Sequence, residues 1–251
     1  MYTSEQRTRL RTELLERAAH DVHLSGTAIT GSAAVDHEDK WSDIDLAFGV
    51  ADGEDLQRVL SDWTAEMYDT HCALHHYDVR AGAWIYRVFL LPSTLQVDLA
   101  FAPEAEFRPL GRTFRLVSGT ATDAKPFPPA RPEDVIGLGW LYAIHARSCI
   151  ARRKLWQAEY MISGVRDQAL VLACLRHKLP AVHGRGLDLL PRAVLDRFED
   201  ALVRQLVANE LLRAFAVALE LLLAEIQNCD DALAARLQVP LSELCRAEQQ
   251  E

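Results

Sequence analysis

Thr30-Gly31-Ser32 and, after nine intervening residues, Ser42-Asp43-Ile44-Asp45-Leu46 are the two segments that decide the fold. The first segment follows a predicted strand, Leu24–Ile29. A glycine and a serine leaving a strand let backbone amides approach phosphate oxygens closely, and the serine hydroxyl adds a donor. The segment therefore predicts a phosphate-binding turn at Gly31 and Ser32.

Asp43 and Asp45 are separated by one residue at the start of the next predicted strand, Ile44–Val50. Because successive side chains of a strand alternate between its two faces, both carboxylates lie on the same face. Two adjacent negative charges are costly unless a cation lies between them, and Mg²⁺ favours carboxylates together with substrate phosphates. The pair predicts a magnesium site, with Ser42 either capping the turn into the strand or binding the nucleotide.

A third acid, Asp98, is embedded in the apolar segment Leu95–Phe101. A buried acid needs a partner. If this strand lies beside Ile44–Val50, Asp98 completes an acidic cluster that can bind metal and accept a proton from an attacking hydroxyl. The alternative is an ion pair between Asp98 and Arg87 on a neighbouring strand.

The first half of the chain combines predicted helices with short strands. Apolar residues recur at helical spacing in Asp55–Tyr68, and a polar helix is expected at Ser4–His20. Segments rich in aromatic and β-branched residues and bounded by turns predict further strands at Leu74–Val79, Trp84–Leu91, Leu95–Phe101 and Thr113–Val117. The expected fold class is α/β (α+β), with a mixed sheet in the N-terminal domain.

A cluster of four prolines in Gly119–Pro132 marks the expected domain boundary. Beyond it, long amphipathic segments with apolar residues three and four apart predict a helical bundle. Its helices are expected at Asp134–Lys154, Leu155–Lys178, Arg192–Val207, Glu210–Ile226 and Asp230–Leu237. The predicted organisation is a catalytic domain at 1–120, a Pro-rich linker at 121–131 and a helical substrate-binding domain at 132–251.

Gly31-Ser32, Asp43-Ile44-Asp45 and Asp98 resemble the pattern of the DNA polymerase β-like nucleotidyltransferase superfamily. A sheet domain followed by helices is also similar to the order in bacterial adenylyltransferases that modify aminoglycoside antibiotics. The resemblance implies that Gly31 and Ser32 bind a nucleoside triphosphate and that Asp43 and Asp45 bind Mg²⁺. It further implies that Asp98 ligates metal or activates the acceptor hydroxyl.

The activity implied by the resemblance is transfer of AMP from ATP, with Mg²⁺ as cofactor, to a hydroxyl of a small molecule. An aminoglycoside-like antibiotic is one candidate acceptor. Three alternatives are AMPylation of a protein partner, as in toxin–antitoxin-like nucleotidyltransferases, a non-catalytic nucleotide-binding module, and an RNA-elongating enzyme. The presence of all three acids disfavours the non-catalytic module, and the sequence leaves the nucleobase preference and the oligomeric state open.

Composition limits the other classes of function. The chain has 251 residues, 49% of them hydrophobic, and a net charge of −9, which disfavours a nucleic-acid substrate. Its apolar runs are too interrupted for a membrane span, and no secretory signal is recognisable, so a cytoplasmic location is expected. Neither a disulfide framework nor a zinc knuckle is expected from the scattered Cys72, Cys149, Cys174, Cys229 and Cys245.

Two further groups of residues have both a structural and a functional interpretation. In the helical half, Glu159, Ser163 and Arg166 fall on one stripe of a helix. The stripe is either a solvated Glu–Arg pair or a surface that offers Arg166 to the triphosphate. Glu104 and Glu106, which follow the Asp98 strand, are alternative candidates for the general base.

Overall fold

The structure is a computed structural model that describes residues 1–111, 113–125 and 130–245. Residues 126–129 of the predicted linker therefore lie outside the described residues. The chain forms two compact units, Met1–Pro128 and Pro129–Glu251. Within the described residues, no helix is both long and apolar enough to cross a membrane.

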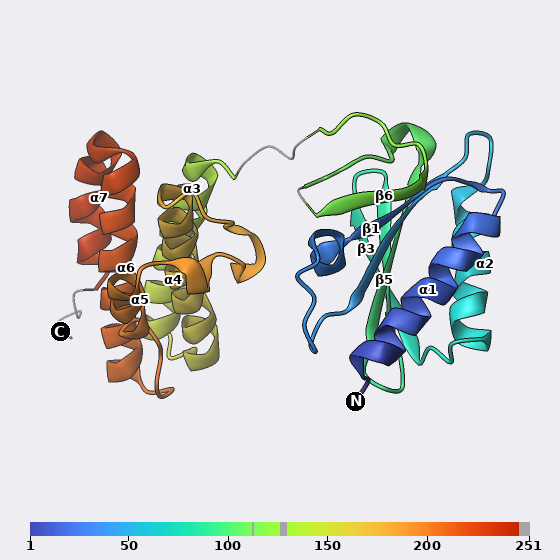
Figure 1. Ribbon diagram of the computed structural model, residues 1–251. Helices are drawn as coiled ribbons and strands as arrows, with labels where there is room; N and C mark the ends of the chain where they lie inside the picture. The colour runs from blue at the N-terminus through green and yellow to red at the C-terminus, as the bar shows by residue number, and fades with distance from the viewer. Residues whose placement is uncertain (112, 126–129, 246–251) are drawn as a thin grey trace. The chain divides into compact units, whose positions relative to one another are not determined.

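A six-stranded mixed sheet forms the centre of the first unit, in the order β3-β4-β5-β2-β1-β6 (Figure 1). Strands β2 and β5 are parallel, and the other neighbours are antiparallel. The strands run β1 Leu24–Thr30, β2 Ile44–Val50, β3 His75–Ala81, β4 Trp84–Leu90, β5 Gln96–Pro103 and β6 Phe114–Gly119. This confirms the mixed sheet that the sequence predicts.

Helices α1 (Ser4–His20) and α2 (Leu56–Asp69) cover one face of this sheet (Figure 1). Helix α1 begins with a capping box, in which Thr3 and Gln6 each accept the other's backbone N–H through a side-chain oxygen. The apolar stripes of both helices pack on alternate residues of the strands, with Trp63 against Phe48 at the centre. Every second residue of β2 and β5 therefore lies in this core, and the residues between them point to the opposite face.

The opposite face of the sheet is lined by small residues and is covered only in part. Ala28, Ala47 and Ala100 are buried there in a row across β1, β2 and β5. Phe107, which follows the short 3₁₀ helix η2 (Glu104–Glu106), lies on Gly26 of β1 and Gly49 of β2, two residues along the strands from this row. The start of β2 and of β5, where Asp45 and Asp98 stand, is only half-buried.

The second unit is the predicted bundle of helices. Helices α3, α4 and α6 form its centre, and Gly139 and Gly164 allow close packing because the side chains of Leu222 and Tyr142 lie directly on them. Two short 3₁₀ helices, η3 (Val182–Gly184) and η4 (Leu187–Leu189), follow α4. The helices run α3 Pro132–Ala151, α4 Leu155–Arg176, α5 Arg192–Glu199, α6 Ala208–Cys229 and α7 Asp231–Glu243.

Helix α5 is shorter than the predicted Arg192–Val207, so that prediction was wrong at its C-terminal end. Beyond Glu199, the carbonyl groups of Asp200 and Leu202 accept hydrogen bonds from the guanidinium of Arg213 on α6. Carbonyls at a helix end need partners, and here a side chain from another helix supplies them. A tertiary contact thus replaces the next helical turn.

Candidate metal and nucleotide site

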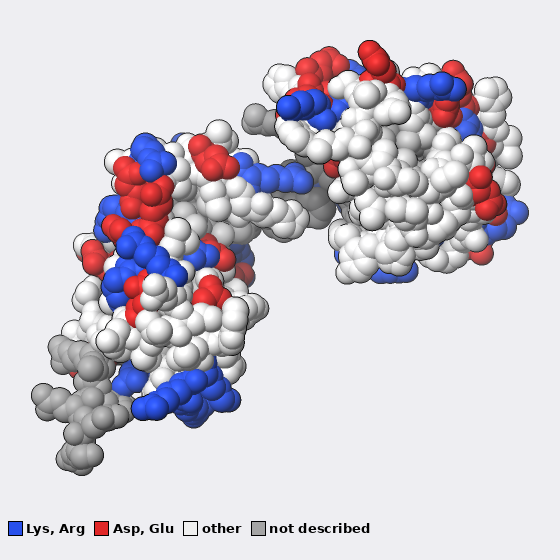
Figure 2. Space-filling model, turned by 90° about the horizontal axis from the view of Figure 1, so that it is seen from below, with Lys and Arg blue, Asp and Glu red and all other residues white. Residues whose placement is uncertain are grey.

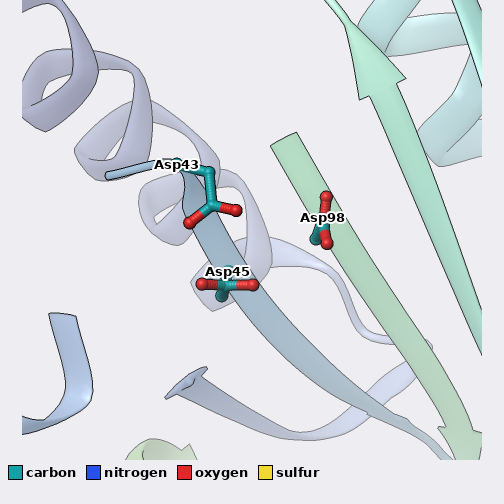
Figure 3. Close-up of side chains that lie close together, drawn as sticks. All are labelled: Asp43, Asp45 and Asp98. Carbon is teal, nitrogen blue, oxygen red and sulfur yellow. The ribbon is translucent and has the colours of Figure 1, made fainter. Parts of the chain in front are cut away.

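Three carboxylates meet on the partly covered face of the sheet. Asp43 immediately precedes β2, Asp45 is its second residue, and Asp98 lies directly opposite Asp45 on the parallel strand β5. One carboxylate oxygen from each lies within 4.8 Å of the others, and Figure 3 shows all three side chains on the same side of the two strands. Within the part of the chain that is described, no other group of three His, Cys, Asp or Glu side chains meets so closely.

Gln96 is a member of this cluster that sequence reasoning missed. Its amide donates to Asp98 at 2.9 Å and to Asp43 at 3.3 Å, so one side chain bridges two of the acids. Gln96 precedes Asp98 by two residues, and alternation along the strand places it on the same face. That spacing was the signal available in the sequence, since a polar residue two positions from a buried acid is its natural neighbour.

The electrostatics of the cluster favour a bound cation. Burial raises the pKa of Asp98 to about 6; the Gln96 hydrogen bond opposes this shift, and the negative charge of Asp43 adds to it. A set of three carboxylates that crowd one another is a donor set that Mg²⁺ accepts, because hard cations prefer oxygen ligands. Asp43, Asp45 and Asp98 therefore fit a divalent metal ion in their residue type and spacing.

This pKa predicts how metal binding responds to pH. Protons compete with Mg²⁺ for Asp98, so we expect the affinity of the nucleotide-free protein for Mg²⁺ to fall about tenfold per pH unit below about pH 6. The stability of the metal-free protein depends on pH in the opposite direction. Protonated Asp98 favours the folded state, and this contribution to stability is lost as pH rises through about 6. Calorimetric titration with MgCl₂ on either side of pH 6 measures the first effect, and a flat profile would contradict it.

The predicted phosphate turn lies directly against the metal cluster. Gly31 opens the short 3₁₀ helix η1 (Gly31–Val35) with a φ of +62°, a conformation that glycine adopts at little cost. A Cβ atom at this position would collide with the carboxylate of Asp45. The glycine is therefore required for two reasons, its backbone angle and the closeness of Asp45, and it places the turn against the acidic cluster.

Replacing Gly31 by Ala is expected to weaken both Mg²⁺ and ATP binding by at least about tenfold, because the methyl group displaces the Asp45 carboxylate. Gly82, in the turn between β3 and β4, provides a matched control: its φ is +61°, and a Cβ atom there would have no neighbour within 4 Å. Gly82→Ala carries the same backbone strain without the collision. Calorimetry on both variants checks the prediction, and equal affinities would reject the placement of the turn.

The loop between η1 and β2 is held by buried hydrogen bonds from helix α1. Arg7, which is 3% exposed, donates to the carbonyl oxygens of Asp39 at 2.5 Å and Ser42 at 3.0 Å. Its Nε also lies 3.1 Å from the carboxylate of Glu38. Because Ser42 precedes Asp43 of the acidic cluster in the chain, these bonds hold the backbone from which Asp43 projects.

The side chain of Ser42 is occupied within the same loop. Its hydroxyl accepts a hydrogen bond from the backbone N–H of Asp39 and donates to the Asp39 carboxylate. The structure thus gives Ser42 a local turn-forming contact, which was one of the two sequence interpretations. Its role in nucleotide binding stays a prediction, as does that of Ser32 at the start of η1.

Arg7→Ala is expected to weaken Mg²⁺ binding about tenfold, because each lost hydrogen bond costs about 1 kcal/mol and frees the loop that carries Asp43. Arg17 on the same helix is the matched control: it stacks 3.9 Å from the ring centre of Trp63, about 15 Å further along α1. Both variants should lower the melting temperature, but only Arg7→Ala should lower the Mg²⁺ affinity. Parallel loss of affinity in both would show a general stability effect.

The ion-pair alternative for Asp98 is wrong. Arg87 lies opposite Leu99 and therefore points to the helix-covered face of the sheet, away from Asp98. Its guanidinium pairs with both carboxylate oxygens of Asp78 at 2.7 and 2.8 Å and lowers the pKa of that acid. The third guanidinium nitrogen donates to Thr64 on α2. All partners of Arg87 named here therefore lie on the helix-covered face of the sheet.

Glu104 and Glu106 do not join the cluster. Glu104 follows the last residue of β5 and accepts the backbone N–H of Asp52, more than about 15 Å along the strands from Asp98. Glu106 pairs with Arg108. In the helical unit, Arg166 pairs with Asp167 instead of Glu159, and Glu159 accepts a hydrogen bond from Ser163. A role for Arg166 in nucleotide binding stays a prediction.

The likeness of this chain to known proteins lies in structure. No protein-family model and no curated protein sequence matches the chain. Among solved structures, the chain is similar to an aminoglycoside 6-adenyltransferase from Bacillus subtilis, with 13% sequence identity, 98% of this chain and 100% of that chain covered, and a TM-score of 0.44. At this identity and TM-score, the likeness does not determine a reaction, which has to be argued from the site itself.

Proposed function

We propose that this protein is a magnesium-dependent nucleotidyltransferase that transfers AMP from ATP to a hydroxyl of a small molecule. The observation that carries the proposal is the meeting of Asp43, Asp45 and Asp98 within 4.8 Å beside a glycine turn of positive φ. Phosphoryl transfer depends mainly on positioning and charge neutralisation, so a small set of carboxylates with a phosphate-binding turn is sufficient machinery.

The proposed role of each site residue follows from its position in the sheet. Mg²⁺ held by the three aspartates would neutralise charge on the triphosphate. The Gly31-Ser32 turn binds phosphate oxygens, and Asp43 and Asp45 face the triphosphate from β2. Asp98 arrives from β5 and accepts the proton of the acceptor hydroxyl. The acceptor oxygen then bonds to the α-phosphorus of ATP, and the bond from that phosphorus to pyrophosphate breaks.

The charge distribution supports a small acceptor over a nucleic acid. On the face drawn in Figure 2, acidic and basic side chains are interspersed over most of the helical unit, basic side chains gather at its lower end, and residues other than Lys, Arg, Asp and Glu dominate the sheet unit. A chain of net charge −9 with this pattern offers little attraction for a polyanion. A role of the helical unit in substrate binding stays a prediction, and the exposed side chains of that unit include Trp140, Trp156 and Tyr160.

The proposal is tested by incubating the purified chain with labelled ATP, Mg²⁺ and a panel of hydroxyl compounds that includes aminoglycosides. We expect pyrophosphate release and a product whose mass equals acceptor plus AMP minus water. Chelation of Mg²⁺ should stop both. Labelled AMP on a co-incubated protein instead of a small molecule would favour the AMPylation alternative, and ATP binding without any transfer would favour the non-catalytic module.

A further inference from the structure

An uncharged surface continues from Asp98 across the two neighbouring strands, on the same face of the sheet. Asp98 lies opposite Val88 on β4, and Val88 lies opposite Tyr77 on β3. Residues directly opposite each other in a sheet share a face, and every second residue along each strand joins them. We call the resulting surface the β3–β4 platform: Tyr77, Val79, Tyr86, Val88 and Leu90.

The platform is exposed although its side chains are apolar or aromatic. Tyr77 is 70% exposed, Val79 is 47% exposed and Leu90 is 46% exposed. Single exposed apolar residues are ordinary, but contiguous ones next to a candidate active site indicate a binding surface. Tyr86 is half-buried and stacks on Trp84, and burial raises the pKa of its phenol, so it stays a hydrogen-bond donor at neutral pH.

The platform carries no acidic or basic side chain. On this face of β3 and β4, the imidazole of His75 lies at the end of the platform, opposite Leu90. The charged residues of β3 and β4, such as Asp78 and Arg87, point to the other face, where they pair with each other. An acceptor lying here therefore meets rings and alkyl groups, and the carboxylates next to the platform are those of the cluster around Asp98.

The direction of the reaction places the acceptor on this side. The attacking and leaving oxygens of a phosphoryl transfer lie roughly in line with the phosphorus. If the triphosphate is bound at the Gly31 turn, beyond β2, the hydroxyl approaches from the side of Asp98, where β4 and β3 follow. Adjacent strands are about 4.8 Å apart, so the platform extends from about 5 to about 10 Å beyond Asp98, the size of one or two sugar or aryl rings.

We propose that the β3–β4 platform binds the acceptor, and that the acceptor is an uncharged hydroxyl compound with a ring or alkyl face instead of a polycation. This rests on the proposed nucleotidyl transfer and specifies its substrate class. Sugar and aryl rings bury their apolar faces on aromatic side chains, and Tyr77 and Tyr86 provide such side chains beside Val88. The hydroxyl that reacts is the one that reaches Asp98.

Substrate specificity tests the proposal through matched acceptors. With labelled ATP and Mg²⁺, we expect transfer to neutral aryl glycosides such as phenyl β-glucoside to exceed transfer to the polycationic kanamycin. Tyr77→Ala should raise KM for the neutral acceptor about tenfold, the effect of losing about 55 Å² of apolar contact, and leave kcat and KM for ATP unchanged. Leu90→Glu should lower activity toward the neutral acceptor and improve relative activity toward kanamycin. Val117→Glu is the control, because Val117 is 49% exposed and lies on β6, the opposite edge strand. It should change the activity toward neither acceptor.

A binding measurement decides the proposal even without turnover. Ligand-observed NMR with phenyl β-glucoside, in the presence of Mg²⁺ and a non-hydrolysable ATP analogue, should detect binding to the wild type and about tenfold weaker binding to Tyr77→Ala. Preference for kanamycin, or platform variants that change only self-association in sedimentation, would overturn the platform while leaving nucleotidyl transfer intact. Absence of AMP transfer to every acceptor, with platform binding retained, would instead reject the proposed function.

Discussion

Asp45→Asn is expected to lower AMP transfer by at least about 10³-fold and to leave the fold intact. The substitution removes charge and preserves volume, and Asp45 is the residue that lies against both the Gly31 turn and the partner acid Asp98. Losing one of three carboxylates weakens the metal site and with it the neutralisation of the triphosphate. Turnover at saturating acceptor and the affinity for Mg²⁺ and ATP, measured on the same preparation, check this expectation.

Glu104→Gln provides the control for Asp45→Asn. Glu104 is an acid at the far end of the same pair of strands, where it accepts a hydrogen bond from the backbone of Asp52. Its neutralisation should leave transfer within about twofold of the wild type. Near-normal turnover of Asp45→Asn in the presence of Mg²⁺ would show that the three aspartates are not the metal site, and the proposed function would fall with it.

Asp98→Asn is expected to lower turnover by about 10² to 10⁴-fold, the usual effect of losing a general base. The affinity for ATP and Mg²⁺ should fall much less than in Asp45→Asn, because Asp98 comes from a different strand and faces the acceptor. In the metal-free protein, burial raises the pKa of Asp98 to about 6, which makes its carboxylate a better proton acceptor than an exposed one. Single-turnover kinetics and nucleotide calorimetry separate the two effects.

Two other outcomes for Asp98→Asn have distinct meanings. Loss of nucleotide binding as complete as in Asp45→Asn would make Asp98 chiefly a metal ligand. Glu104 and Glu106 would not replace it as the base, because the structure places Glu104 at the other end of the strands and pairs Glu106 with Arg108. Unfolding of the variant would contradict the site assignment. Arg87 pairs with Asp78, so Asp98→Asn breaks no ion pair with Arg87 that could explain the loss of the fold.

Local sequence rules were sufficient for most of the elements, but not for the end of α5, and for half of the site. Strand alternation places Asp43 and Asp45 on one face from their spacing alone, and β2 has the predicted bounds Ile44–Val50. The glycine and serine that follow a predicted strand indicated the turn at Gly31, and the structure gives Gly31 a φ of +62°. These inferences succeed because each depends on neighbours within a few residues, where backbone geometry leaves few choices.

Contacts between distant segments were decided only by the tertiary structure. The parallel pairing of β2 with β5 puts Asp98 opposite Asp45, 53 residues away, and no local pattern specifies the register of two such strands. The same holds for Arg7, which reaches from α1 to the carbonyl of Ser42, and for Arg213, which ends α5 by donating to the carbonyls that follow it. Each of these arginines donates to backbone carbonyls that packing has removed from water and that need a hydrogen-bond partner. Which carbonyls are removed from water depends on how the whole core packs.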